Sequence, residues 1–209
     1  MIANIIKKIE KTHFNKIESY LHYVYGAETG RTLFFNFSIK LEELYDISNF
    51  DSIIKSEQAF KYILPVIALY RTFIEKGMDK TVAKNSIKSY FLEYDKKDID
   101  KFSKFIKTVF YYSIFDRKIK KFQEKKLPTK EFDIKWEEFN LQRVYFNVNK
   151  CMYIKILDEY GEKDLIDIFC VREKNMFSKI NSKIDFNLKE TLANGNQECK
   201  FRFFKKESR

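Results

Sequence analysis

The chain has 209 residues, of which 44% are hydrophobic and 33% charged, and its formal net charge is +10. This composition excludes a mostly disordered protein and predicts a single domain over residues 1–209. A positive charge favours a polyanionic partner, but acidic residues lie between the lysines along the whole chain. The densest basic run, 118–126, is predicted to be a solvated helix face, so we do not expect nucleic acid as a partner.

The number of cysteines bears on the compartment. The chain has three, an odd number with wide spacing, which argues against a disulfide framework and favours a reducing environment. Residues 1–11 lack the apolar core and cleavage site of an export signal. The longest nearly apolar run, 62–70, is shorter than the roughly 20 residues that a membrane helix needs. We therefore expect a cytoplasmic protein without membrane association.

Residues 1–127 are predicted to be mainly helical, because their apolar residues recur at helical spacing. The predicted helical segments are 1–25, as one or two helices, then 32–45, 56–77, 79–91 and 98–114. Segment 32–45 also alternates like a strand, but its spacing favours a helix. Ser56 and Asp79 are expected to cap the third and fourth segments, and Pro65 should kink the third or mark its first turns. His13 and His22 are expected to be packing residues rather than catalytic bases.

After Pro128 the apolar period changes from 3.6 to 2, which predicts strands. The predicted elements of residues 128–209 are strands 132–137 and 143–149, helices 151–160 and 163–177, and strands 184–189 and 199–203. Asn194 and Gly195 form a strong turn signal between the last two strands. The order ββααββ predicts an α+β fold, with an antiparallel sheet of about four strands and the helix pair on one face.

The three thiols have different local patterns. Cys170 and Glu173 are three residues apart on one predicted helix, so their side chains share a face. Cys151 lies where a strand enters a helix, and the helix dipole is expected to favour its thiolate. Cys199 shares a strand face with Phe201, which favours a buried packing role. The cysteines lack the close pairing of zinc ligands, so a three-thiol metal site is a minor alternative and no metal is expected.

Three motifs carry a resemblance to a known family: FNVNKCMY at 146–153, FCVRE at 169–173 and ETLANGNQECKFRF at 190–203. Together with LPVIALY at 64–70 they resemble the L-2-amino-thiazoline-4-carboxylic acid hydrolase family over about residues 60–204. Glu173 stands where this family usually has Asp, and Glu198 where a second Cys often precedes the last one. These departures leave the identity of the substrate open.

The resemblance implies hydrolytic opening of a cyclic amidine, such as L-2-amino-thiazoline-4-carboxylate, to a carbamoyl-cysteine-type product without a cofactor. Such chemistry needs a nucleophile, a proton-transfer group and a cation for the substrate carboxylate. The residues that we predict to be catalytic are Cys170, Cys151 and Glu173. Those that we predict to bind substrate are Cys199, Arg202, Arg143 and Asn147. Attack by a water that the carboxylate organises, and a purely structural thiol cluster, remain alternatives.

The GxxxCxF ending is also similar to that of 4-vinyl reductase type ligand-binding domains. This second resemblance implies a non-catalytic module whose cysteines hold a small molecule or a metal. In both readings the expected partner is a small molecule, and a homo-oligomer is possible.

Overall fold

The computed structural model describes residues 2–48, 59–106, 115–127, 129, 131–178 and 184–206. Contacts divide the chain into two compact units. The first comprises Met1–Tyr94 with Ile156–Ile168, and the second Asp95–Lys155 with Phe169–Arg209. The single domain over residues 1–209 stays a prediction.

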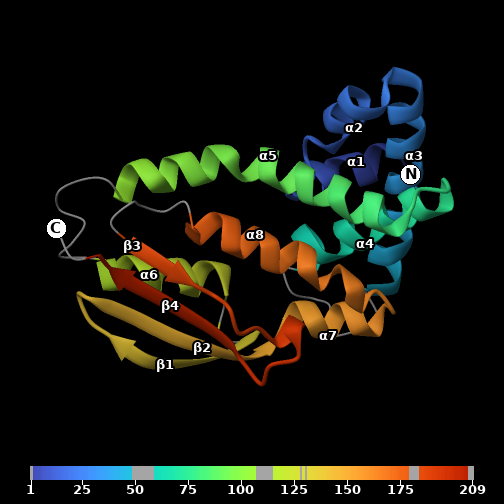
Figure 1. The fold of residues 1–209 in the computed structure, drawn as a ribbon. Coiled ribbons are helices and arrows are strands. Elements are labelled where there is room, and N and C mark those ends of the chain that lie inside the picture. Colours follow the sequence, from blue (N-terminus) through green and yellow to red (C-terminus); the bar gives the residue numbers. More distant parts are fainter. Residues whose placement is uncertain are drawn as a thin grey trace. The chain divides into compact units, whose positions relative to one another are not determined.

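The first unit is helical, as the sequence predicts (Figure 1). Its elements up to α5 are α1 (Ile2–Glu10), α2 (Ile17–Tyr25), α3 (Ala27–Ser48), a π-helix (Ala59–Ile63), α4 (Leu64–Glu75) and the start of α5 (Lys80–Ile106). Phe14 and Phe37 are fully buried and stack with their ring centroids 6.0 Å apart. α3 approaches α2 so closely at Gly30 that a Cβ there would lie 2.6 Å from a ring carbon of His22. Only glycine fits this approach without a shift.

Two local predictions for the helices up to α5 are confirmed and one is wrong. Pro65 lies in the first turn of α4, and the Asp79 side chain accepts hydrogen bonds from the amides of Thr81 and Val82. The helices predicted separately over 79–91 and 98–114 begin instead as one helix, α5. No glycine or proline separates them, so the backbone hydrogen bonds continue. The predicted cap at Ser56 and the end of the second stripe, 107–114, lie outside the described residues.

The later part of the chain forms a four-stranded antiparallel sheet, which confirms the α+β class (Figure 1). Its elements are α6 (Phe115–Lys126), β1 (Phe132–Phe139), β2 (Arg143–Cys151), α7 (Met152–Glu159), a 3-10 helix (Lys163–Leu165), α8 (Ile166–Ser178), β3 (Ile184–Asn187), a second 3-10 helix (Leu192–Asn194) and β4 (Cys199–Lys205). The strand order is β1-β2-β4-β3, with antiparallel neighbours throughout.

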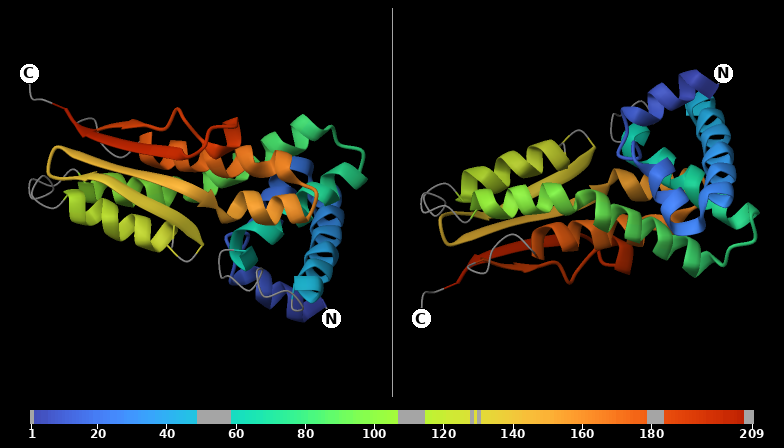
Figure 2. Two further views of the ribbon diagram at one scale, coloured as in Figure 1. Left: turned by 90° about the horizontal axis from the view of Figure 1, so that it is seen from below. Right: turned by 90° about the horizontal axis from the view of Figure 1, so that it is seen from above.

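One face of the sheet is apolar and covered by helix α8, and we call it the inner face. Phe146 of β2 and Phe201 of β4 are partners there, with their rings stacked 4.7 Å apart. Phe177 of α8 packs edge-on against Phe203 at 5.0 Å. Each phenylalanine buried in this way contributes about 1.5–3 kcal/mol. Figure 2 shows α8 running alongside the strands from below and from above.

The opposite, outer face carries the alternate polar residues, and a β-bulge decides which face Cys151 joins. The β2 partners of two adjacent β1 residues are Val148 and Lys150, so Asn149 is the extra residue. Strict alternation from Val148 would place Cys151 on the outer face. The bulge instead pairs Cys151 with Phe132, which is buried with the inner-face residues. The bulge thus changes the face of Cys151 and leaves the alternation from Arg143 to Val148 intact.

Candidate active site

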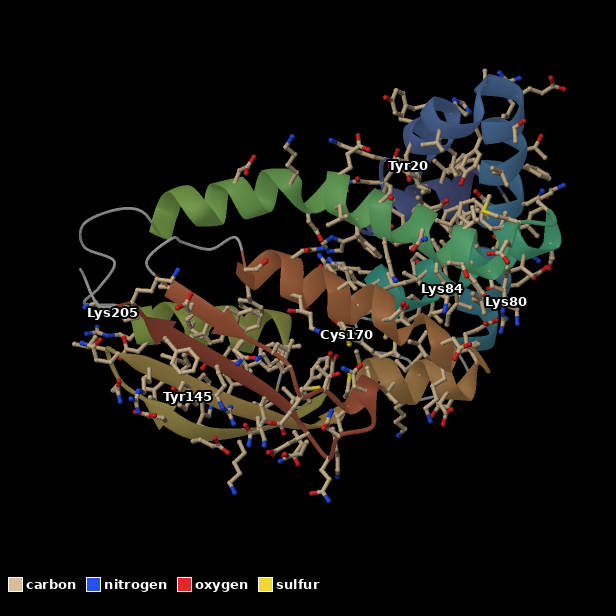
Figure 3. The ribbon with its side chains drawn as sticks, viewed as in Figure 1. Tyr20, Lys80, Lys84, Tyr145, Cys170 and Lys205 are labelled. Atoms are coloured by element: carbon tan, nitrogen blue, oxygen red, sulfur yellow. The ribbon has the colours of Figure 1, made fainter. Side chains whose placement is uncertain are left out.

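Three elements bring together the three residues predicted to be catalytic and Cys199, which is predicted to bind substrate. Cys151 ends β2, Cys199 begins β4, and Cys170 and Glu173 lie one turn apart on α8. Figure 3 shows Cys170 on the side of α8 that is turned toward the strands. Cys199 and Glu173, in their ionised forms, each raise the pKa values of both Cys151 and Cys170, so the four groups are neighbours. We call them the thiol cluster.

The thiols of the cluster are partly exposed, whereas Glu173 is only 7% exposed. The Glu173 carboxylate therefore lies in a region of low dielectric constant. In such a region a charge interacts more strongly with its neighbours than it does in water.

Burial determines the state of Cys151. The amides of Tyr153 and Ile154, in the first turn of α7, donate to its thiol and lower its pKa, as the helix N-terminus predicts. Desolvation outweighs them and raises the pKa of Cys151 to about 12. The prediction of a favoured thiolate is therefore wrong, because the position on the strand end buries the sulfur.

Cys170 is also a neutral thiol at pH 7. Burial raises its pKa to about 12, and Cys199, Cys151 and Glu173 raise it further in their ionised forms. Lys174, which follows Glu173 and is exposed, acts in the opposite direction. A positive charge placed near Cys170 thus favours its ionisation.

Cys199 is tied to the loop before its strand. Its Sγ accepts a hydrogen bond from the amide of Leu192 at 3.2 Å, which lowers its pKa, but burial has the larger effect and raises it. The loop itself closes on Thr191, whose carbonyl accepts from the backbone amides of Asn194 and Asn196. The turn predicted at Gly195 is present, with φ of +82°. The hydrogen bond from Leu192 thus gives Cys199 a structural role in holding this loop.

The polar residues predicted to bind substrate are not brought to the cluster. Arg143, Arg202 and Asn147 point to the outer face, opposite the thiols. Arg202 pairs with Glu137 at 2.8 Å, and Asn147 donates to Glu137 at 2.6 Å and to Glu198 at 2.8 Å. These side chains therefore bind one another rather than a ligand at the cluster. The pattern identified their polar face but not its relation to the thiols.

A buried ion pair next to the cluster was missed by sequence reasoning. Arg172, between Cys170 and Glu173, donates two hydrogen bonds to Asp95 of α5, at 2.5 and 2.9 Å. Both side chains are 6% exposed. Arg172 lies inside the FCVRE motif, but its partner is 77 residues away, and no spacing signal points to it.

Aromatic rings also flank the cluster. Tyr153, two residues after Cys151, stacks on Phe169, which precedes Cys170, with ring centroids 4.7 Å apart. Phe132, the strand partner of Cys151, meets Tyr153 edge-on at 5.3 Å. All three rings are buried and pack on one another, so they fix the elements from which Cys151 and Cys170 project.

Within the part of the chain that the structure describes, no three His, Cys, Asp or Glu side chains are arranged to hold a metal ion. The metal-binding alternative therefore has no donor set among these residues. The helices described include none that is long and apolar enough to cross a membrane.

The fold and the cluster define an α+β protein with thiols and a carboxylate gathered beneath one sheet face. The family model described as L-2-amino-thiazoline-4-carboxylic acid hydrolase matches residues 56–203, and the chain belongs to this family. Comparison with curated proteins gives no match. The crystal structure of an Fe(II) unliganded H-NOX protein from K. algicida aligns with 100% of this chain and 98% of its own at 12% identity, but its TM-score of 0.38 is too low to support an argument.

Proposed function

We propose that the protein is a hydrolase that opens a cyclic amidine of the L-2-amino-thiazoline-4-carboxylate type, and that the thiol cluster is its reaction centre. Family membership supports the reaction class. The observation that carries the proposal is the convergence of Cys151, Cys170 and Glu173 within the matched segment. The substrate is a small molecule, and no cofactor takes part.

The charge of the cluster suits a protonated amidine. A buried carboxylate and neutral, polarisable sulfurs stabilise a cation better than an anion. The bound cation would in turn lower the pKa of Cys170, as Lys174 already does. The bound substrate thereby supplies the positive charge that favours ionisation of the Cys170 thiol.

In the first step Cys170 transfers its proton to Glu173 while its sulfur bonds to the amidine carbon. Breaking the ring C–S bond then opens the ring, and the departing sulfur takes the proton from Glu173. The adduct is an isothiourea on Cys170. Water adds to the same carbon and releases the Cys170 thiol, leaving a carbamoyl group on the product. The sum is substrate plus one water, and Glu173 acts as base and then acid.

The substrate carboxylate needs a cation other than the arginines of the outer face. Lys174 is the basic side chain whose charge reaches Cys170, and it is exposed one residue beyond Glu173. We assign Lys174 the role of binding the substrate carboxylate. This role replaces the one predicted for Arg202 and Arg143.

The test is an assay of purified protein with L-2-amino-thiazoline-4-carboxylate, following loss of the ring and formation of carbamoyl-cysteine. The Glu173→Gln variant keeps the size of the side chain and removes the base, so kcat is expected to fall at least about 100-fold. Glu138→Gln, on the outer strand face, is the matched control and should stay within about twofold. Equal activity of the two variants would remove Glu173 from the mechanism.

Binding without turnover in the wild-type protein would favour the other reading, a non-catalytic ligand-binding module. Calorimetry with the same compound distinguishes this result from no binding at all. Neither result depends on the identity of the nucleophile.

A further inference from the structure

The loop between β3 and β4 is held from both faces of the sheet. On the inner face, the amide of Leu192 donates to Cys199 Sγ at 3.2 Å. On the outer face, Glu198 accepts from Asn147, and Glu190 pairs with Lys200 at 2.6 Å. Glu190 and Glu198 lie at the two ends of the loop, so side-chain contacts hold both ends to the sheet.

Asn147 is the central residue of the hydrogen bonds that hold the loop on the outer face. It is 2% exposed, and its Nδ2 group donates both to Glu137 Oε1 at 2.6 Å and to Glu198 Oε2 at 2.8 Å. One neutral amide thus joins two carboxylates that would otherwise repel each other. Because carboxylates only accept hydrogen bonds, the orientation of this amide is fixed.

We propose that Asn147 is a positioning residue for the thiol cluster, acting through Glu198 on the opposite face of the sheet. It holds the loop so that the Leu192 amide stays on Cys199 and the loop keeps water from that thiol. Releasing the loop removes the amide, which raises the pKa of Cys199, and admits water, which lowers it. Since burial has the larger effect, the net change is a more reactive Cys199.

The test uses Asn147→Asp, which keeps the shape and places a third carboxylate beside Glu137 and Glu198. Deuterium uptake by the loop, residues 191–198, is expected to become about tenfold faster. Alkylation of Cys199 by iodoacetamide, read by peptide mass, should rise about tenfold. Both readouts use the full-length protein without substrate.

Asn149→Asp is the matched control. It makes the same chemical change two residues further along β2, beside Asp133 rather than beside the loop. Neither readout should change in this variant. If Asn147→Asp does not fold, Glu198→Ala releases the same loop end and is expected to give the same two increases. An unchanged loop and Cys199 in a folded variant, or equal changes in the Asn149→Asp control, would overturn the proposal.

The contribution of Asn147 to ring opening rests on the proposed function. There, Asn147→Asp is expected to lower kcat about tenfold and to leave KM within about threefold, because the loop orders the cluster rather than the substrate. A released loop with unchanged kcat would remove this catalytic contribution. Failure of the wild type to open the ring would contradict the proposed function alone, since the exchange and alkylation readouts need no turnover.

Discussion

The two faces of the sheet use the same strands for opposite purposes. On the inner face, burial keeps Cys151 and Cys170 neutral, with pKa values near 12. On the outer face, Arg202 and Lys200 are bound to carboxylates and are partly exposed. Polarity alone therefore does not mark a reactive site. The inner face has the thiols whose protonation a ligand would change, whereas Arg202 and Lys200 on the outer face are already paired with carboxylates.

The largest contrast is expected between ion pairs. Arg172→Met leaves the Asp95 carboxylate buried without this counter-charge, and should cost about 3–5 kcal/mol of stability. Arg143→Met removes an exposed, 3.9 Å pair with Glu138 on the outer face, and should cost less than about 0.5 kcal/mol. Urea unfolding measures both. Equal losses of stability in the two variants would contradict the difference between the buried and the exposed ion pair.

The next contrast concerns thiol reactivity. Because a neutral thiol is inert, raising a pKa from about 9 to about 12 lowers the thiolate fraction at pH 7 about 1000-fold. Alkylation of Cys151 and Cys170 should therefore be slow and should still rise about tenfold per pH unit between pH 9 and 11. A cysteine introduced at exposed Lys135 on the outer strand face should level off near pH 9. Similar profiles for all three thiols would show that burial does not control them.

A smaller effect on stability is expected in the loop between β3 and β4, at Gly195. Gly195 has φ of +82°, and a Cβ added there would meet nothing within 4 Å. Gly195→Ala should therefore cost about 1 kcal/mol through backbone strain alone, and Gly195→Asn less, because asparagine adopts this conformation more readily. Thermal unfolding compares them. An alanine variant as stable as wild type would show that the loop tolerates another backbone conformation.

The order of elements after Pro128 followed from periodicity, since alternation at 132–136 and the helical spacing around Cys170 are local signals. Cys170 and Glu173 were correctly placed on one helix for the same reason. The face of Cys151 was not predictable, because the bulge at Asn149 depends on pairing with β1.

The electrostatics of the site were less accessible to sequence reasoning. The helix N-terminus after Cys151 is a local feature of the sequence. The burial that raises the pKa of the Cys151 thiol comes from other elements of the sheet unit. The Arg172–Asp95 pair joins helices far apart in sequence and leaves no pattern. Local chemistry thus gave the residue types, and tertiary packing gave their charge states.

In the proposed reaction, the inner-face thiol of Cys170 forms the bond to substrate. The most direct test is kcat for ring opening in Cys170→Ser, with circular dichroism to confirm the fold. We predict a fall of at least about 1000-fold, because a hydroxyl in this setting is a far weaker nucleophile than a thiol. Activity within about tenfold of wild type would contradict the claim and assign the attack to water.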